Sequence, residues 1–217
     1  MKDINQLLLN FEYKKNFKDE DFYVSKSNYF AFNLINTWPK WEKKFINICG
    51  DNFSGKSHLT NIFLKKFKGI KINAHSFKSE HLHEIKVYEN IILENFDQNI
   101  DEVLIYSLFN TIDQDNKYLI INSTTPINEI NFKLDDLKSR AKNCLFAKIE
   151  KPDDELMFAL ILKNFSDRQI VIDKKLIDFI IKRIDRSYDK IFEFIYKIDE
   201  LSLKKKNQLI LKRSKKH

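Results

Sequence analysis

Eight consecutive residues, 50–57, constrain the fold of this 217-residue chain more than any other segment. They read Gly-Asp-Asn-Phe-Ser-Gly-Lys-Ser and match the pattern G-x-x-x-x-G-K-[ST], with two of the chain's three glycines at its fixed positions. An apolar run from Phe45 to Cys49 precedes the motif, and a helical pattern from Lys56 to Phe67 follows it. This is the strand, loop and helix context that a phosphate-binding loop requires.

The residue types of this loop suit the phosphates of a nucleotide. The glycines let the backbone approach closely, and successive amides at the start of the helix stabilise negative charge. The Lys56 ammonium would reach the outer phosphates, and the Ser57 hydroxyl can coordinate Mg²⁺. The predicted nucleotide-binding residues of this segment are Gly50, Asp51, Asn52, Phe53, Ser54, Gly55, Lys56, Ser57 and His58.

Apolar runs alternate with helical patterns over the first two thirds of the chain. The runs expected to form buried strands are 45–49, 70–73, 90–93, 118–122 and 145–149. Helical spacing covers 25–38, where Ser25 can cap the helix and Pro39 ends it, and it recurs at 56–67, 102–114 and 134–140. This order predicts an α/β fold with a five-stranded parallel sheet and helices on both faces.

The pattern changes after Pro152. No strand-like run follows, and 153–164, 173–184 and 187–201 each have the spacing of an amphipathic helix. We therefore expect an N-terminal segment at 1–21, an α/β nucleotide-binding domain at 22–150, and a small all-helical lid with a basic tail at 151–217.

Polar residues follow two of the predicted strands. Glu94 ends the apolar run that begins at Asn90, and a P-loop protein needs a carboxylate near Mg²⁺ on a neighbouring strand. The alternative is that Glu94 only marks the exit from the sheet, but the P-loop favours the metal reading. Asn122 and Thr124 end the next run, although such residues also form ordinary turns.

Composition and charge exclude several classes of protein. Hydrophobic residues make up 43% of the chain, so a packed core is expected rather than disorder. No apolar run approaches the roughly 20 residues that span a bilayer, and we find no signal peptide, so a cytoplasmic protein without membrane contact is expected.

The net charge is +7, but the only dense basic block lies at 204–216. It is typical of a solvated terminus or a weak polyanion-binding tail, so any DNA contact should be indirect or non-specific.

Several segments resemble one family in order and spacing. Residues 6–11, Gln-Leu-Leu-Leu-Asn-Phe, resemble a sliding-clamp-binding peptide of the type Q-L-x-L-x-[LF]. Residues 22–28 resemble the F-x-V-x-x-S-N segment of DnaA-type proteins, and 134–140 resembles their L-x-D-L-x-S-R segment. Together with the P-loop and the strand ends, essentially the whole chain is similar to the Hda-type AAA+ proteins. These are DnaA-related regulators that inactivate the bacterial replication initiator.

The resemblance implies that the ligands are ATP or ADP with Mg²⁺. Phe22 and Val24 would border the adenine as an apolar slot, and Asn28 would supply its polar edge. Ser57 and Glu94 would hold the metal ion, with Glu94 as the Walker B acid.

Two further residues take roles from the resemblance, and with Glu94 they form the implied catalytic set. Asn122 would be the first sensor of the γ-phosphate, with Thr124 as the alternative. Arg140 would be an arginine finger that reaches a nucleotide on a neighbouring subunit. The sequence alone would make Arg140 a surface cation at the end of a helix, where it interacts favourably with the helix dipole.

The resemblance also implies partners. They are the sliding clamp of DNA polymerase III, DnaA, and further copies of this chain. The clamp would be contacted by Gln6, Leu7, Leu9 and Phe11, although this segment could also fold back on its own domain. The implied function is to stimulate ATP hydrolysis on DnaA in trans while tethered to the clamp.

The chain departs from the family pattern at three places. Asn95 stands where AAA+ proteins usually have a Glu or Asp that polarises the attacking water, so weak or absent intrinsic hydrolysis is expected. Asp189 falls where DnaA-type lids usually have a sensor II arginine, with Arg186 and Lys190 as neighbouring substitutes. We find no helix-turn-helix domain after the lid, so sequence-specific origin binding is not expected.

Two other functions are compatible with these features. A DnaA-like DNA-binding or helicase-loading module would use the basic tail and assemble with ATP. A small-molecule kinase would also need a P-loop, but the helical region after the fifth strand and the segment 134–140 argue against it.

Overall fold

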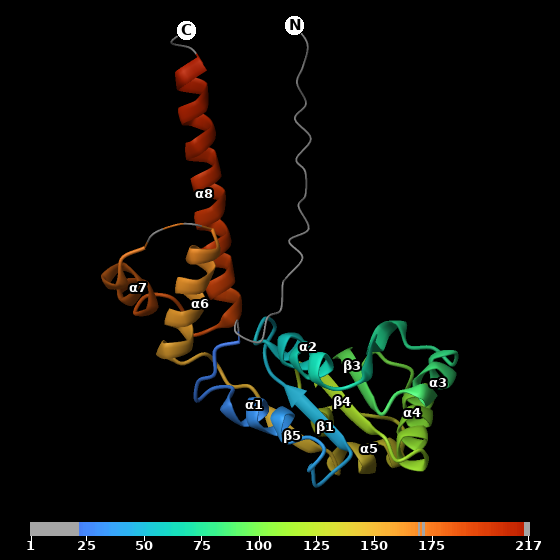
Figure 1. Ribbon diagram of the computed structural model, residues 1–217. Coiled ribbons are helices and arrows are strands. Elements are labelled where there is room, and N and C mark those ends of the chain that lie inside the picture. The colour runs from blue at the N-terminus through green and yellow to red at the C-terminus, as the bar shows by residue number, and fades with distance from the viewer. Residues whose placement is uncertain (1–21, 169, 171, 215–217) are drawn as a thin grey trace, which may run out of the picture.

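The computed structural model describes residues 22–168, 170 and 172–214, with side chains described as far as Leu201. Its centre is a sheet of five strands in the order β2-β3-β4-β1-β5 (Figure 1). The strands are β1 (Phe45–Cys49), β2 (Gly69–Asn73), β3 (Asn90–Phe96), β4 (Tyr118–Ser123) and β5 (Leu145–Lys148). All neighbouring pairs are parallel, so the predicted α/β fold with a five-stranded parallel sheet is confirmed. The clamp-binding peptide predicted at 6–11 lies outside the described residues.

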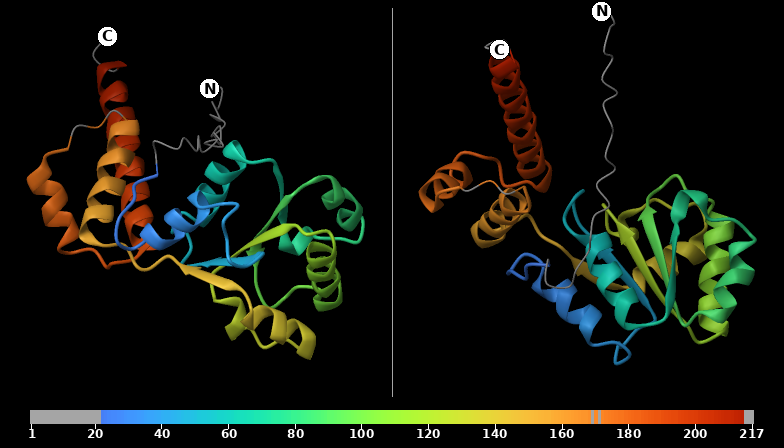
Figure 2. Two further views of the ribbon diagram at one scale, coloured as in Figure 1. Left: turned by 60° about the horizontal axis from the view of Figure 1, so that its bottom comes forward. Right: turned by 45° about the horizontal axis from the view of Figure 1, so that its top comes forward.

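Helices cover both faces of the sheet (Figures 1 and 2). They are α1 (Tyr29–Asn36) and α2 (Lys56–Lys66) on one face, and α4 (Glu102–Gln114) and α5 (Asp135–Lys142) on the other. Successive strand residues point to opposite faces, so Ile92 packs in the core under α1 and α2 while Ile91 and Leu93 pack in the core under α4 and α5. Both cores are completed by buried Ile, Leu and Phe side chains.

The strand register brings three strand ends to one edge of the sheet. β1 lies between β4 and β5, with Ile48 beside Asn122 on β4 and Ala147 on β5. β3 lies on the other side of β4, with Leu93 beside Ile121. Because parallel strands all point the same way, the residues that follow β1, β3 and β4 share this carboxyl edge, where open α/β sheets usually bind ligands.

β3 is longer than its apolar run predicts. It continues from Leu93 to Phe96, so Glu94 is a buried strand residue, 7% exposed, and not the residue that ends the strand. Asn95 has a φ of 56°, and the pairing with β4 shifts between Leu93 and Phe96. The extension depends on partners in both neighbouring strands, because Glu94 pairs with Asn73 on β2 and Phe96 pairs with Ser123 on β4.

The start of α1 also differs from the prediction. The helix begins at Tyr29, and the Ser25 hydroxyl contacts the Ser27 hydroxyl at 2.7 Å without capping the helix. Asn28 precedes the helix but makes no capping bond, because its side chain accepts from the Ser25 amide at 2.9 Å. Unpredicted short elements are the helix α3 (His81–Glu84) and 3₁₀ turns at Ala74–Ser76, Ile85–Val87 and Ile127–Glu129.

The described residues beyond β5 form helices and contain no strand (Figure 1). They are α6 (Asp154–Asp167), α7 (Lys174–Ile181) and α8 (Tyr188–Ser214), of which α8 runs well past its predicted end at Leu201. These helices have a core of their own, with Met157, Ile161 and Ile177 completely buried. Within the described part of the chain, no helix combines the length and the apolar sequence needed to cross a membrane.

Asp153 connects the helical region to the segment before α1. Its carboxylate caps α6 by accepting from the Leu156 amide at 2.8 Å, and it also accepts from the amide and the hydroxyl of Ser27, each at 3.3 Å. Burial raises the pKa of the Asp153 carboxyl, but hydrogen bonds from Leu156, Ser25 and Ser27 outweigh burial and hold the pKa below its usual value.

Asp153→Ala is expected to lower the free energy of unfolding by about 1 kcal/mol at neutral pH, because α6 loses its cap. The folded-state pKa lies below the unfolded value, so this contribution is present above the unfolded pKa and disappears as pH falls through the folded pKa. Urea unfolding across pH should therefore show the difference from wild type shrinking below about pH 4. Asp153→Asn, which can still cap, should lose less. A difference that stays constant down to acid pH would contradict this role.

Candidate functional site

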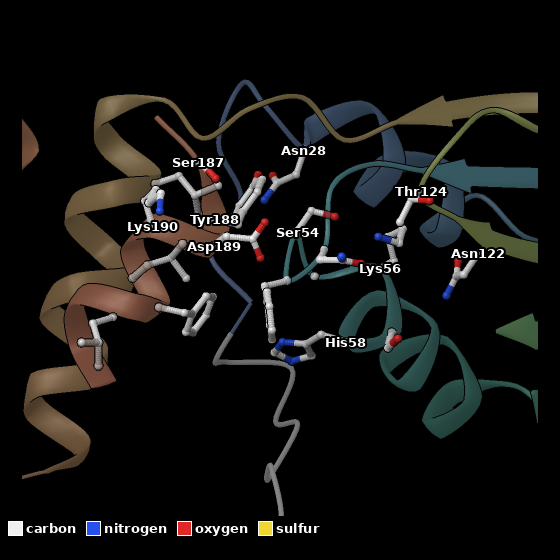
Figure 3. Close-up of a pocket in the computed structure, with 18 of the residues that line it drawn as sticks. Asn28, Ser54, Lys56, His58, Asn122, Thr124, Ser187, Tyr188, Asp189 and Lys190 are labelled. Atoms are coloured by element: carbon white, nitrogen blue, oxygen red, sulfur yellow. The ribbon is translucent and has the colours of Figure 1, made fainter. Parts of the chain in front are cut away.

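An open pocket of about 1650 Å³ lies between the carboxyl edge of the sheet and the helical region. The P-loop, the ends of β3 and β4, and parts of α6 and α8 line it. In Figure 3, Ser54, Lys56 and His58 lie between the start of α8, with Ser187 to Lys190, on one side and Asn122 and Thr124 on the other. Small-molecule pockets usually measure about 300–1,000 Å³, so this one has room for a nucleotide.

The backbone geometry of the P-loop requires glycine at both fixed positions of the motif. A Cβ at Gly50 would lie 2.8 Å from the carbonyl oxygen of Ile149, so a larger residue would not fit. Gly55 has a φ of 98°, a left-handed conformation that glycine adopts without strain. Phe53 also has a positive φ, 61°, and its half-exposed ring lies 5.4 Å from the ring of Phe192 on α8. The tip of the loop therefore contacts the helical region.

Lys56 extends along the P-loop. Its ammonium donates to the carbonyl oxygens of Gly50 and Asp51 at 2.6 and 2.7 Å. Burial lowers the pKa of Lys56, and the nearby Glu94 and Asp51 carboxylates only partly oppose this effect. A desolvated ammonium on a loop at the pocket can exchange carbonyl partners for the oxygens of an anion.

Glu94 is the centre of a hydrogen-bonded group at the base of the pocket. One oxygen accepts from the Ser57 hydroxyl at 2.7 Å. The other accepts from the Thr60 hydroxyl at 2.9 Å and from the Asn122 amide at 3.0 Å. The structure thus brings together three residues singled out in the sequence, Ser57, Glu94 and Asn122, and adds Thr60.

Two buried polar atoms at this site have no hydrogen-bond partner within the described residues. They are the hydroxyl oxygen of Ser54 and the side-chain carbonyl oxygen of Asn122. Buried polar groups in folded proteins are nearly always paired. Because both residues line the pocket, a bound polar ligand or water can supply the missing partners.

The carboxyl end of β3 carries Asn95 into the pocket. Asn95 is exposed on the bulge, and Asp97, two residues further on, lies 3.3 Å from the Nε2 atom of His75. Thr124 lines the same side of the pocket from the end of β4. Position 95 itself therefore offers an amide and not a carboxylate to the pocket.

The three residues predicted beside the adenine are placed differently from one another. Phe22 lines the pocket, with its ring stacked on Phe32 at 5.7 Å and perpendicular to His58 at 5.3 Å. Asn28 also lines the pocket, but its side chain donates to the Tyr23 carbonyl oxygen and accepts from an amide of the same turn. Val24 is not among the pocket-lining residues.

The helical side of the pocket contains residues that the sequence did not single out. Arg168, at the end of α6, and Tyr188, at the start of α8, both line it. Arg168 is held by Asp199 at 3.6 Å. A cation just after a helix has no distinctive local pattern, so the sequence offered no signal for Arg168.

The two proposed substitutes for a sensor arginine are separated by the turn before α8. Asp189 and Lys190 line the pocket, and Lys190 pairs with Glu193 at 3.0 Å. Arg186 does not line it and pairs instead with Asp154 at 2.8 Å. Of the two cations, only Lys190 lines the pocket, on its helical side (Figure 3).

Arg140 lies on α5 and does not line this pocket. Its guanidinium pairs with Asp113, donates to Asn110 at 2.6 Å, and lies 5.6 Å from the ring centre of Tyr106. All three partners belong to α4. Any contact of Arg140 with a nucleotide would therefore involve a different molecule.

These features define a class of protein. The chain has the AAA+ fold: a parallel sheet in the order β2-β3-β4-β1-β5, a P-loop after β1, a carboxylate on β3 and a polar residue on β4.

Comparison with solved structures supports this assignment of the fold. Domain III of the Thermotoga maritima replication initiation protein DnaA has a TM-score of 0.69 at 18% identity, over 89% of this chain and 90% of that chain. AMPPCP-bound DnaA from Aquifex aeolicus has a TM-score of 0.66 at 21% identity, over 85% and 64%.

Sequence comparison points to the same proteins. The chromosomal replication initiator protein DnaA of Borrelia turicatae (strain 91E135) is 28% identical over 198 residues, covering 79% of this chain and 41% of that protein. The chain thus spans about two fifths of the length of the curated relatives it matches. No protein-family model matches it. Sequence and fold together support homology with DnaA-type AAA+ proteins.

Proposed function

We propose that this chain binds ATP or ADP, with the phosphates on the P-loop at 50–57 and the adenine near Phe22 and Asn28. The observation that carries this proposal is the 2.7 Å hydrogen bond between the Ser57 hydroxyl and Glu94, which joins the end of the P-loop to a strand carboxylate. The unpartnered Ser54 and Asn122 oxygens support it, since a phosphate and its water molecules could pair with them. The helical region from 151 onward would act as a lid over this nucleotide.

Mg²⁺ is part of this proposal. The Ser57 hydroxyl would coordinate the ion, and Glu94 would hold one of its water molecules, which fits the pairing of these two side chains. When bound, the ion would neutralise charge on the phosphates. No group of three or more His, Cys, Asp or Glu side chains able to hold a metal occurs in the described part of the chain. The nucleotide and water would therefore supply most of the ligands.

The same proposal includes weak intrinsic hydrolysis. Asn95 lines the pocket beside the outer end of β3, and an amide has no basic pKa with which to accept a proton from water. Asp97 is engaged with His75. The chain would therefore hydrolyse bound ATP slowly.

The test of nucleotide binding is an equilibrium titration of the purified chain with a fluorescent adenine nucleotide. Competition by unlabelled ATP and ADP, but not by GTP, is the expected result. Absence of saturable binding would overturn the proposal.

We further propose a role in the cytoplasm as a regulator of replication initiation. The chain would tether to the sliding clamp of DNA polymerase III through Gln6, Leu7, Leu9 and Phe11, and would offer Arg140 to ATP on DnaA. Similarity to DnaA supports this reading, because AAA+ domains of one family associate with one another's nucleotide sites. A DnaA-like DNA-binding or helicase-loading module is equally consistent with the fold, and would bind single-stranded DNA directly.

A binding assay with the purified sliding clamp distinguishes these two functions. Wild-type protein is expected to bind purified clamp, and the double variant Gln6→Ala/Leu9→Ala is expected to lose binding by about tenfold or more, because two anchors of a short docking peptide are removed. Its nucleotide affinity should be unchanged. Lack of clamp binding by wild type, together with tight, salt-dependent binding of single-stranded DNA, would favour the DNA-binding module.

A further inference from the structure

A lysine from the edge strand lies beside the buried carboxylate of the candidate site. The Lys71 ammonium, on β2, is 3.4 Å from Glu94, and the two side chains are 27% and 9% exposed. Lys71 also donates to the side-chain oxygen of Asn61 on α2. The ammonium is therefore held between α2 and β3 and is not a solvated surface charge.

The position of Lys71 within the sheet makes this contact notable. Its register partner on β3 is Ile92, a residue of the apolar core under α1 and α2. A lysine on that face must be desolvated in part, which is unfavourable unless a counter-charge compensates it. Glu94 provides that charge, and it receives three further hydrogen bonds, from Ser57, Thr60 and Asn122.

This pair alters the electrostatics around a bound phosphate. A carboxylate beside the P-loop repels the phosphates of a nucleotide unless a cation neutralises it. A divalent cation usually has that role, but here the Lys71 ammonium neutralises the same carboxylate from inside the protein.

We propose that Lys71 is a resident counter-charge that makes nucleotide binding by this chain only weakly dependent on Mg²⁺. The inference rests on the proposed adenine nucleotide site and concerns one residue of it. It implies that the chain retains a nucleotide, ADP in particular, when Mg²⁺ is removed.

The test compares ADP affinity in millimolar Mg²⁺ and in excess EDTA. For wild type, the two affinities should differ by less than about threefold. For Lys71→Met, affinity in EDTA should fall by about tenfold, because the Glu94 charge is no longer neutralised, while affinity in Mg²⁺ changes little. Lys71→Arg, which keeps the charge, should resemble wild type.

Two further variants control for fold and for overall charge. Lys86→Met removes an exposed lysine that precedes β3 at the opposite edge of the sheet, and should leave both affinities unchanged. Lys71→Met/Glu94→Gln removes both members of the pair, and should recover in EDTA the binding that Lys71→Met loses. Circular dichroism of each variant checks that it is folded.

The outcomes separate this inference from the proposed function. Strong Mg²⁺ dependence in wild type, or an equal loss for Lys71→Met in both buffers, would overturn the role of Lys71 while leaving nucleotide binding intact. Absence of ADP binding by wild type in both buffers would instead refute the nucleotide site, and the role of Lys71 with it.

Discussion

Lys56→Met is expected to lower the affinity for ATP and ADP by roughly 100-fold or more. The ammonium is the cation that the P-loop offers to the phosphates, and it is already partly desolvated in the chain without ligand. Truncating one partner of a buried charge pair costs about 2–5 kcal/mol, and each 1.4 kcal/mol is a tenfold change in affinity. Equilibrium titration with a fluorescent adenine nucleotide measures the loss.

The Lys56→Met variant should fold as well as wild type. Burial lowers the pKa of Lys56 and outweighs its favourable interactions with Glu94 and Asp51, so folding disfavours the charged form and its removal should not lower stability. An unchanged thermal midpoint with lost binding is therefore expected. Lys86→Met serves as the matched control and should bind normally. If Lys56→Met bound nucleotide like wild type, the phosphates would not be at this loop.

Arg140→Glu is expected to abolish the stimulation of ATP hydrolysis on DnaA that we propose for this chain. A guanidinium that neutralises charge developing on the γ-phosphate can be worth about 10³ to 10⁵ in rate, so the rate should fall to that of DnaA alone. Nucleotide affinity of this chain should change by less than about twofold, because Arg140 is remote from its pocket. Phosphate release from DnaA, measured with and without each variant, gives the result.

Because Arg140 also contacts α4 within the chain, a control must separate loss of the arginine finger from loss of this packing. Arg140 pairs with Asp113 on α4, so Arg140→Glu also places two carboxylates together. The charge swap Arg140→Glu/Asp113→Arg restores an ion pair between α4 and α5 without restoring the guanidinium at position 140. If stimulation returns with the charge swap, Arg140 acts by packing α5 against α4. If stimulation survives in Arg140→Glu, Arg140 does not act as an arginine finger.

Much of the α/β architecture could be predicted from local sequence. The apolar run at 45–49 matches β1 residue for residue, and the helical pattern at 102–114 matches α4. The prediction was incomplete where an element depends on its neighbours. β3 continues through Glu94 to Phe96 because these residues pair with Asn73 on β2 and Ser123 on β4, and Ser25 bonds Ser27 rather than capping α1.

Some residues of the candidate site could be predicted from the sequence, and others could not. The P-loop and the polar residues Glu94 and Asn122 are recognisable by type and position, and the structure brings them within hydrogen-bonding distance. Val24 was expected at the pocket and is not among the residues that line it. Asn28, by contrast, does line the pocket, and its side chain is fixed by hydrogen bonds to Ser25 and Tyr23.

Short-range patterns were enough to define the strands, the P-loop and the helical region, because apolar spacing, fixed glycines and breaks at proline act over a few residues. They could not reveal that Lys71 pairs with Glu94, that Arg168 and Lys190 line the same pocket as the P-loop, or that Arg140 pairs with a residue of α4. Each of these depends on strand register or helix packing between residues far apart in the chain. Such contacts arise from the burial of shared apolar surface, and the folded arrangement of the elements is what creates them.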